Sequence, residues 1–155
     1  MKALIHSKPK VLAKYNAILG EGPIWNHKTL EYSFVDILSR KFFILKKNIL
    51  KTYRLPCQIS CLLPTRKKNV WIAASKNKII KIFIKNKKVN IFTIKTISEP
   101  SHNRFNDGKC DSFGRIWLSS MDNNQKLNTG QLWFFQSSIK TSFRHTYNIF
   151  LVSLK

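Results

Sequence analysis

A pattern of short β-rich runs, repeated about every forty residues, most constrains the fold of this chain. Val, Ile, Phe, Tyr, Trp and Thr gather in short stretches that Asn, Lys, Ser, Gly or Pro separate, as expected for strands joined by turns. Ser33, Trp71 and Trp117 hold the same place in three of these runs, at spacings of 38 and 46 residues. The sequence therefore predicts an all-β chain without a long amphipathic helix.

Each repeat accommodates four strands. We expect first strands near 22–26, 58–63 and 105–111, second strands at 30–37, 68–75 and 114–121, third strands at 41–46, 78–83 and 130–135, and fourth strands near 49–55, 89–95 and 140–147. A four-stranded repeat of this length is the signature of a propeller blade. We expect one domain over residues 1–155, with blades at about 20–56, 57–97 and 103–148. A sandwich or barrel of regular short strands has a similar period, and the period alone does not exclude it.

The chain is strongly basic, with 28 Lys and Arg against seven Asp and Glu and a formal net charge of +21. Such a charge suits a nucleic acid or an anionic membrane surface. However, 22 of the 28 are Lys, spread over much of the chain, whereas specific phosphate and base recognition relies on the Arg fork. Lys, Asn, Ile and Phe are abundant and have A/T-rich codons, so codon drift explains the charge better than nucleic-acid binding.

The three cysteines, Cys57, Cys61 and Cys110, form an odd set without a secretory signal, which predicts free thiols in a reducing compartment. No His or Cys cluster accompanies Cys57 and Cys61, so burial as small hydrophobes is favoured over a zinc site. The polar, basic residues 1–15 do not resemble a signal peptide, and no apolar run is long enough to span a membrane. We expect a cytoplasmic protein without a membrane partner.

A first candidate motif places Glu21 between Gly20 and Gly22, directly before Pro23 and a predicted strand. Glycines let a backbone approach a ligand closely, and a carboxylate held there suits a hard cation, which prefers oxygen ligands. A charged surface turn is the alternative interpretation, and this short motif alone favours it.

The second motif, residues 103–117, is longer and more specific. It places Arg104 and Asn106 near the start of a predicted inner strand, at the point that matches Glu21 in the first repeat. In a propeller these three side chains would converge at one mouth of the central channel. Asp107 and Asp111 have a simpler interpretation as hairpin-turn residues.

The segments 19–25, 32–37 and 103–117, continuing to Met121 and Asp122 and into the strand at 130–133, resemble the SMP-30/gluconolactonase/regucalcin family. The resemblance covers about residues 20–148. It implies a six-bladed propeller that hydrolyses aldonolactones with one divalent metal ion (calcium, zinc, magnesium or manganese). It also implies that Glu21 is a metal ligand and that Arg104 and Asn106 contact the sugar. Some members have a substrate-reading Glu at the place of Asn124, so that contact would become an amide.

The same resemblance implies a chain about twice this long, because the family's other metal ligands, an Asn and an Asp that also serves as base, come later in the sequence. We therefore expect no catalytic residue and little lactonase activity in this chain alone. Three blades would leave apolar faces and strand edges open, so we expect a half-propeller to aggregate, to pair with a second half-propeller chain or to stay partly folded. The sugar lactone is the expected small-molecule partner. A non-catalytic interaction module and a basic nucleic-acid-binding protein are the alternative functions.

Overall fold

A computed structural model describes residues 8–136 and 147–148 of the chain. This part contains three four-stranded antiparallel sheets and no helix, as the sequence predicts. The first sheet consists of β1 (Gly20–Asn26), β2 (Glu31–Asp36), β3 (Lys41–Lys46) and β4 (Ile49–Arg54). The second consists of β5 (Cys61–Pro64), β6 (Val70–Ser75), β7 (Lys78–Lys85) and β8 (Lys88–Thr96), and the third of β9 (Asn103–Cys110), β10 (Ile116–Asp122), β11 (Gln131–Phe135) and β12 (Tyr147–Asn148).

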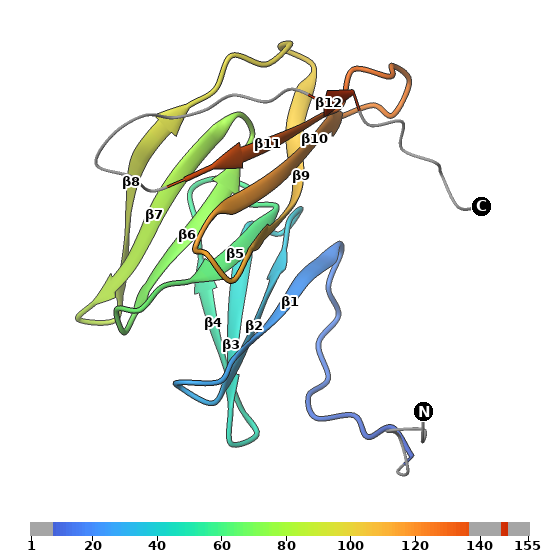
Figure 1. Cartoon of the computed structure of the whole chain (residues 1–155). Helices are drawn as coiled ribbons and strands as arrows, with labels where there is room; N and C mark the ends of the chain where they lie inside the picture. Colours follow the sequence, from blue (N-terminus) through green and yellow to red (C-terminus); the bar gives the residue numbers. More distant parts are fainter. Residues whose placement is uncertain (1–7, 137–146, 149–155) are drawn as a thin grey trace, which may run out of the picture.

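Strands follow one another in space in the order of the sequence within every sheet. The three sheets are separate and do not close into a barrel, and Figure 1 shows them arranged around β1, β5 and β9. Strand β5 contacts both β1 and β9. The first strand of each sheet therefore lies innermost, and the connections between sheets bring the next chain segment back to the centre.

Burial is high in the middle strands and low in the fourth strands, whereas β1, although innermost, is mostly exposed. In β3, Phe42, Phe43 and Ile44 are consecutive and all buried, so both faces of this strand are covered. In contrast, most residues of β4 and β8 are exposed or half-buried. A sheet whose middle strands are apolar on both faces needs a neighbour on each side, which explains why the strands lack simple alternation.

The apolar core consists of two clusters, one at each junction between sheets. The first joins sheets one and two and includes Val35, Phe42, Leu62, Trp71 and Ile82. The second joins sheets two and three and includes Cys61, Leu63, Ile79, Phe105, Leu118 and Trp133. The two faces of β5 supply both clusters, since Leu62 lies in one and its neighbours in the other.

The expected strands match the observed ones to within a few residues. The largest shift is in β5, which begins at Cys61 rather than near residue 58, and β9 begins two residues early. Most of the strand expected at 140–147 lies outside the described residues, although Tyr147 and Asn148 pair with β11. The single-domain assignment with its three blade boundaries stays a prediction.

The described cysteines are free thiols, as predicted. Cys61 is buried in the core, and burial raises its pKa to about 12, so it behaves as a small hydrophobe. Cys57 is half-buried against the first cluster, and Cys110 is exposed. In the part of the chain that the structure describes, no helix has the length and hydropathy of a membrane span.

Candidate functional site

A β-bulge in β1 presents Glu21. The pairing of β1 with β2 runs from Glu21 opposite Val35 to Ile24 opposite Ser33, so one extra residue lies between these pairs. Gly22 is buried there at φ 59°, and a Cβ on it would lie 3.7 Å from the backbone of Ser60 and Cys61. Glycine fits this left-handed, closely packed position best, and bulges commonly redirect a side chain near a functional site. The carboxylate of Glu21 is exposed at the inner end of the first sheet.

A second bulge lies in β9, at Asn106. Asp107 pairs with Ser119 and Phe105 with Ser120, so Asn106 is the extra residue between them. Its Oδ1 accepts a hydrogen bond from Nη1 of Arg104 at 3.3 Å, and the same nitrogen donates to the carbonyl of Phe105 at 3.0 Å. Arg104 and Asn106 thus form one polar unit on the innermost strand of the third sheet.

The Arg104 side chain of this unit interacts electrostatically with Glu21. Burial lowers the pKa of Arg104, and the Glu21 carboxylate acts in the opposite direction by stabilising the guanidinium cation. Glu21 and Arg104 are far apart in the sequence, but β1 and β9 both pack beside β5. The structure therefore brings Glu21 electrostatically close to Arg104, and Arg104 into contact with Asn106.

A cavity of about 490 Å³ opens at this end of the sheets, and its lining includes Arg104 and Asn124. Glu21 and Asn106 are outside the set of lining residues. Asn124 is exposed in the loop between β10 and β11. The cavity also has contributions from the β2–β3 turn, the β6–β7 turn and the segments that join successive sheets. Its wall is thus shared by all three sheets.

Asp122 fixes the loop that carries Asn124. Its side chain is buried and accepts hydrogen bonds from the backbone N–H groups of Asn124, Lys126 and Leu127 at 2.9 to 3.1 Å. The bond from Lys126 contributes most to a lowered pKa of Asp122, which burial partly opposes. A loop held at three points presents Asn124 in a defined position.

Asp36 has the same kind of role at the end of β2. It is fully buried and accepts hydrogen bonds from the backbone N–H groups of Ile18, Leu19 and Ser39. Burial alone would raise the pKa of Asp36, but bonds to Ser39 and to the two residues before β1 outweigh it and lower the pKa. Asp36 therefore ties the entry of β1 to the β2–β3 turn.

A part-buried polar network surrounds Asn103, a buried residue of the cavity lining. Nδ2 of Asn103 donates to Glu99 Oε2 at 2.9 Å and to the Thr129 carbonyl at 2.8 Å, while Oγ1 of Thr129 donates to Asn103 Oδ1 at 2.7 Å. Nε1 of Trp133 donates to Glu99 Oε1 at 2.5 Å. This network fixes the residue directly before Arg104. The sequence signal was the scarcity of acids, which makes Glu99 conspicuous, but its partners could not be inferred.

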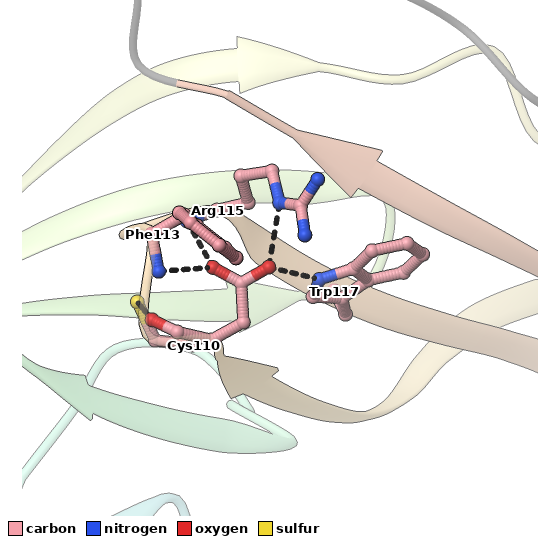
Figure 2. Close-up of polar contacts among 5 residues, drawn as sticks. Cys110, Phe113, Arg115 and Trp117 are labelled. Atoms are coloured by element: carbon pink, nitrogen blue, oxygen red, sulfur yellow. Dashed lines mark hydrogen bonds and ion pairs between the residues drawn. The ribbon is translucent and has the colours of Figure 1, made fainter.

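The turn interpretation of Asp111 is confirmed. Figure 2 shows the Phe113 backbone, the Arg115 side chain and the Trp117 indole turned toward one carboxylate, that of Asp111. Arg115 Nε is 2.6 Å from Asp111 Oδ2, and Trp117 Nε1 donates to the same oxygen at 3.0 Å. The Trp117 bond is the largest cause of a pKa of about 2 for Asp111. This carboxylate closes the β9–β10 hairpin.

Asp107 also serves the local backbone. Its Oδ1 accepts a hydrogen bond from the N–H of Gly108 at 2.7 Å, and its Oδ2 lies 3.7 Å from Lys109 Nζ. The hairpin-turn interpretation is therefore wrong for Asp107, which lies within β9 opposite Ser119, next to the bulge at Asn106.

The donors that the structure describes do not form a complete site for a divalent cation. No group of three or more His, Cys, Asp or Glu side chains gathers within residues 8–136. Glu21 offers one exposed carboxylate, whereas Asp36, Asp111 and Asp122 are occupied by backbone and side-chain donors. A hard cation needs about six oxygen ligands. These residues alone therefore do not provide a complete coordination shell for a catalytic metal ion.

Comparison with known proteins matches residues 19–150 to the SMP-30/Gluconolactonase/LRE-like region. An uncharacterized protein of Sulfolobus acidocaldarius is 32% identical over 124 residues, which is 79% of this chain and 43% of that protein. The 6-deoxy-6-sulfogluconolactonase of Pseudomonas putida is 26% identical over 125 residues, covering 79% of this chain and 42% of the relative. The chain therefore spans less than half the length of these relatives.

Solved structures agree on the fold. A luciferin-regenerating enzyme superposes with a TM-score of 0.74 at 23% identity, over 86% of this chain and 47% of the other. A calcium-binding regucalcin of Agrobacterium tumefaciens superposes with a TM-score of 0.67 at 20% identity, over 81% and 42%. The three sheets are thus blades of the propeller type that these proteins share. On the family match over residues 19–150, the chain belongs to the SMP-30/gluconolactonase/LRE-like family.

Proposed function

We propose that this chain provides the substrate-binding side of a sugar-lactone hydrolase site. Membership in the family supports a lactonase-type function at the general level. The observation that carries the proposal is the joint position of Arg104 and Asn124 on the wall of one cavity, with Asn106 bonded to Arg104. These are the three side chains predicted from the sequence to contact a sugar.

In this proposal the residues bind and orient the lactone. Arg104 retains N–H groups beyond the one bonded to Asn106 and donates them to ring or hydroxyl oxygens of the sugar. Asn106 and Asn124 both donate and accept through their amides, which suits hydroxyl groups. Hydrolysis adds water across the acyl carbon–oxygen bond, so that the ring oxygen leaves as a hydroxyl group and the acyl carbon becomes a carboxylate.

Glu21 is proposed as one ligand of a divalent cation whose other ligands lie outside the described residues. A cation of this kind, when bound, polarises the lactone carbonyl and lowers the pKa of a bound water. The exposed carboxylate beside the Arg104 cation supports this role for Glu21. We expect the chain alone to show little turnover.

Binding tests the proposal without requiring turnover. Gluconolactam, a stable analogue of the lactone, should bind in a calorimetric titration, and Arg104→Gln should weaken binding by about tenfold, as expected for a lost charge-assisted hydrogen bond. Arg66→Gln removes the same charge from an exposed position in the β5–β6 loop and should leave affinity unchanged. Equal affinity of the Arg104→Gln variant and the unmodified, folded protein would overturn the proposal.

Turnover is tested separately with gluconolactone, with and without added calcium, zinc, magnesium or manganese. Background hydrolysis in every condition agrees with an incomplete catalytic set. Metal-dependent hydrolysis that Glu21→Ala abolishes would contradict our expectation of little activity and would assign the whole reaction to this chain.

A further inference from the structure

The cavity wall carries more positive charge than a site for neutral sugars requires. Besides Arg104, the lining includes Arg40 and Lys76, and none of the described residues that line it is an Asp or Glu. The Glu21 carboxylate acts on Arg104, and Asp36, Asp122 and Glu99 accept hydrogen bonds from other groups. Within the described residues, neither Arg40 nor Lys76 forms an ion pair. A concave wall that carries several cations concentrates anions.

Arg40 and Lys76 hold equivalent places in the fold. Arg40 lies in the β2–β3 turn of the first sheet, and Lys76 lies in the β6–β7 turn of the second. Both have left-handed backbone conformations, with φ 54° and 49°. Both residues are exposed, and the two neighbouring sheets thus each contribute a cationic turn residue to the lining of the same cavity.

Backbone hydrogen bonds fix both turns. The carbonyl of Arg40 accepts from the N–H of Leu55 at 2.9 Å, and the carbonyl of Lys76 accepts from the N–H of Phe105 at 2.7 Å. The second bond crosses from the second sheet to the third and places Lys76 directly beside the residue that follows Arg104. Asn77 strengthens the same turn, because its backbone carbonyl and side-chain amide bond to the N–H and carbonyl of Ile97.

The geometry points to an oxyanion subsite formed by Arg40 and Lys76, so that the substrate class is a sugar lactone bearing a phosphate, sulfonate or carboxylate group. This inference rests on the proposed function, because Arg104 and Asn106 are taken to hold the sugar. The guanidinium of Arg40 suits a bidentate contact with such a group, and the ammonium of Lys76 supplies a point charge.

The overall charge of the chain is the main competing explanation, since +21 attracts any anion. Matched surface variants separate the two. Arg66→Gln is the control for Arg40→Gln, and Lys47→Gln is the control for Lys76→Gln. Lys47 is exposed in the β3–β4 turn at φ 46°, nearly the conformation of Lys76, and lies outside the cavity lining.

The experiment compares gluconolactam with its 6-phosphate ester by calorimetric titration, with inorganic phosphate as a third probe. The ester should bind about tenfold more tightly than the neutral lactam, a gain typical of one charge-assisted contact. Arg40→Gln and Lys76→Gln should each remove most of this preference while leaving affinity for the neutral lactam unchanged. The two control variants should keep the preference.

Equal loss of preference in the control and cavity variants would assign anion binding to the overall charge and overturn the subsite. No preference in the unmodified protein would overturn it as well. Failure of the proposed function has a different signature: the neutral lactam does not bind, whereas inorganic phosphate still binds with dependence on Arg40 and Lys76. That result would retain the oxyanion subsite and remove the sugar.

Discussion

At the residue scale, most of the rare carboxylates, together with the buried amide of Asn103, hold backbone segments in place through hydrogen bonds. Asp36, Asp111 and Asp122 each accept several hydrogen bonds from loops or turns. Glu21 differs, because its carboxylate is exposed beside a cation. The few acidic residues of the sequence therefore have structural roles more often than they are candidate metal ligands.

Asn103→Ala should destabilise the protein by about 1–3 kcal/mol in the free energy of unfolding. The substitution removes the buried amide of Asn103 that bonds to half-buried Glu99 and Thr129, and their polar atoms would be left without that partner. Urea denaturation provides the measurement. Asn128→Ala, at an exposed position, is the control, and a similar loss in both variants would show that the network contributes little.

At the element scale, the junction between the second and third sheets depends on close approach of β5 and β9. A Cβ on Gly108 would lie 2.3 Å from Leu118 Cδ2 and 2.9 Å from Cys61 Sγ. Both neighbours belong to the buried core, so they have little room to move. Glycine is required here by space, because its φ lies outside the left-handed region.

Gly108→Ala should therefore lower the free energy of unfolding by about 1–3 kcal/mol through overpacking. Gly20→Ala is the matched control, since within 4 Å its new methyl group meets only Cβ of exposed Ala17, at 3.2 Å. Chemical denaturation of both variants should show a much smaller loss at Gly20. A Gly108→Ala variant as stable as the unmodified protein would contradict the close packing of this junction.

Much of the element layout could be predicted, because β-rich runs and turn residues are local signals. The two bulges of the candidate site could not, since the extra residue at Gly22 or Asn106 depends on the register with the partner strand. The side-chain contacts could not be predicted either: Glu99 lies in the segment between β8 and β9, yet it accepts a hydrogen bond from Trp133 of β11, 34 positions later. Arg104 and Asn124 could be placed near one site only through family resemblance.

At the scale of the whole molecule, the net charge of +21 destabilises the folded state because the cations repel one another. The described residues contain three ion pairs, and all of them involve partly exposed side chains. Attraction of this kind is weak, so repulsion among the cations dominates the long-range electrostatics.

Salt should therefore stabilise the fold. Raising NaCl from about 0.05 M to about 0.5 M shortens the Debye length and screens the repulsion, so the Tm should rise. A Lys87→Gln/Lys88→Gln variant, with two exposed charges removed between β7 and β8, should give a shallower rise. A Tm that falls with salt would show that the surface ion pairs outweigh the repulsion.

Acid should destabilise the fold in a window set by the depressed carboxylate pKa values. Asp111 has a folded pKa of about 2 against an ordinary value of 3.8, and the pKa values of Asp36 and Asp122 are also lowered. Their stabilising contribution is complete above the unfolded pKa near 3.8 and is lost as pH falls toward the folded values. Thermal unfolding at constant ionic strength should show this loss, and Asp111→Asn should reduce the slope. A Tm independent of pH across this window would contradict the assignment.

The left-handed turns at Arg40 and Lys76 oppose thermal stability to the binding of anionic ligands. For a residue with a Cβ this conformation costs about 1–2 kcal/mol, whereas glycine adopts it freely. Lys76→Gly should thus raise the Tm, measured by differential scanning calorimetry, while removing a charge from the cavity; an unchanged or lower Tm would contradict this. At position 76, higher thermal stability and discrimination between charged and neutral ligands then require different residues. Selection for heat resistance alone would erode the preference for charged sugars, and the cationic turns would persist only while that preference is useful.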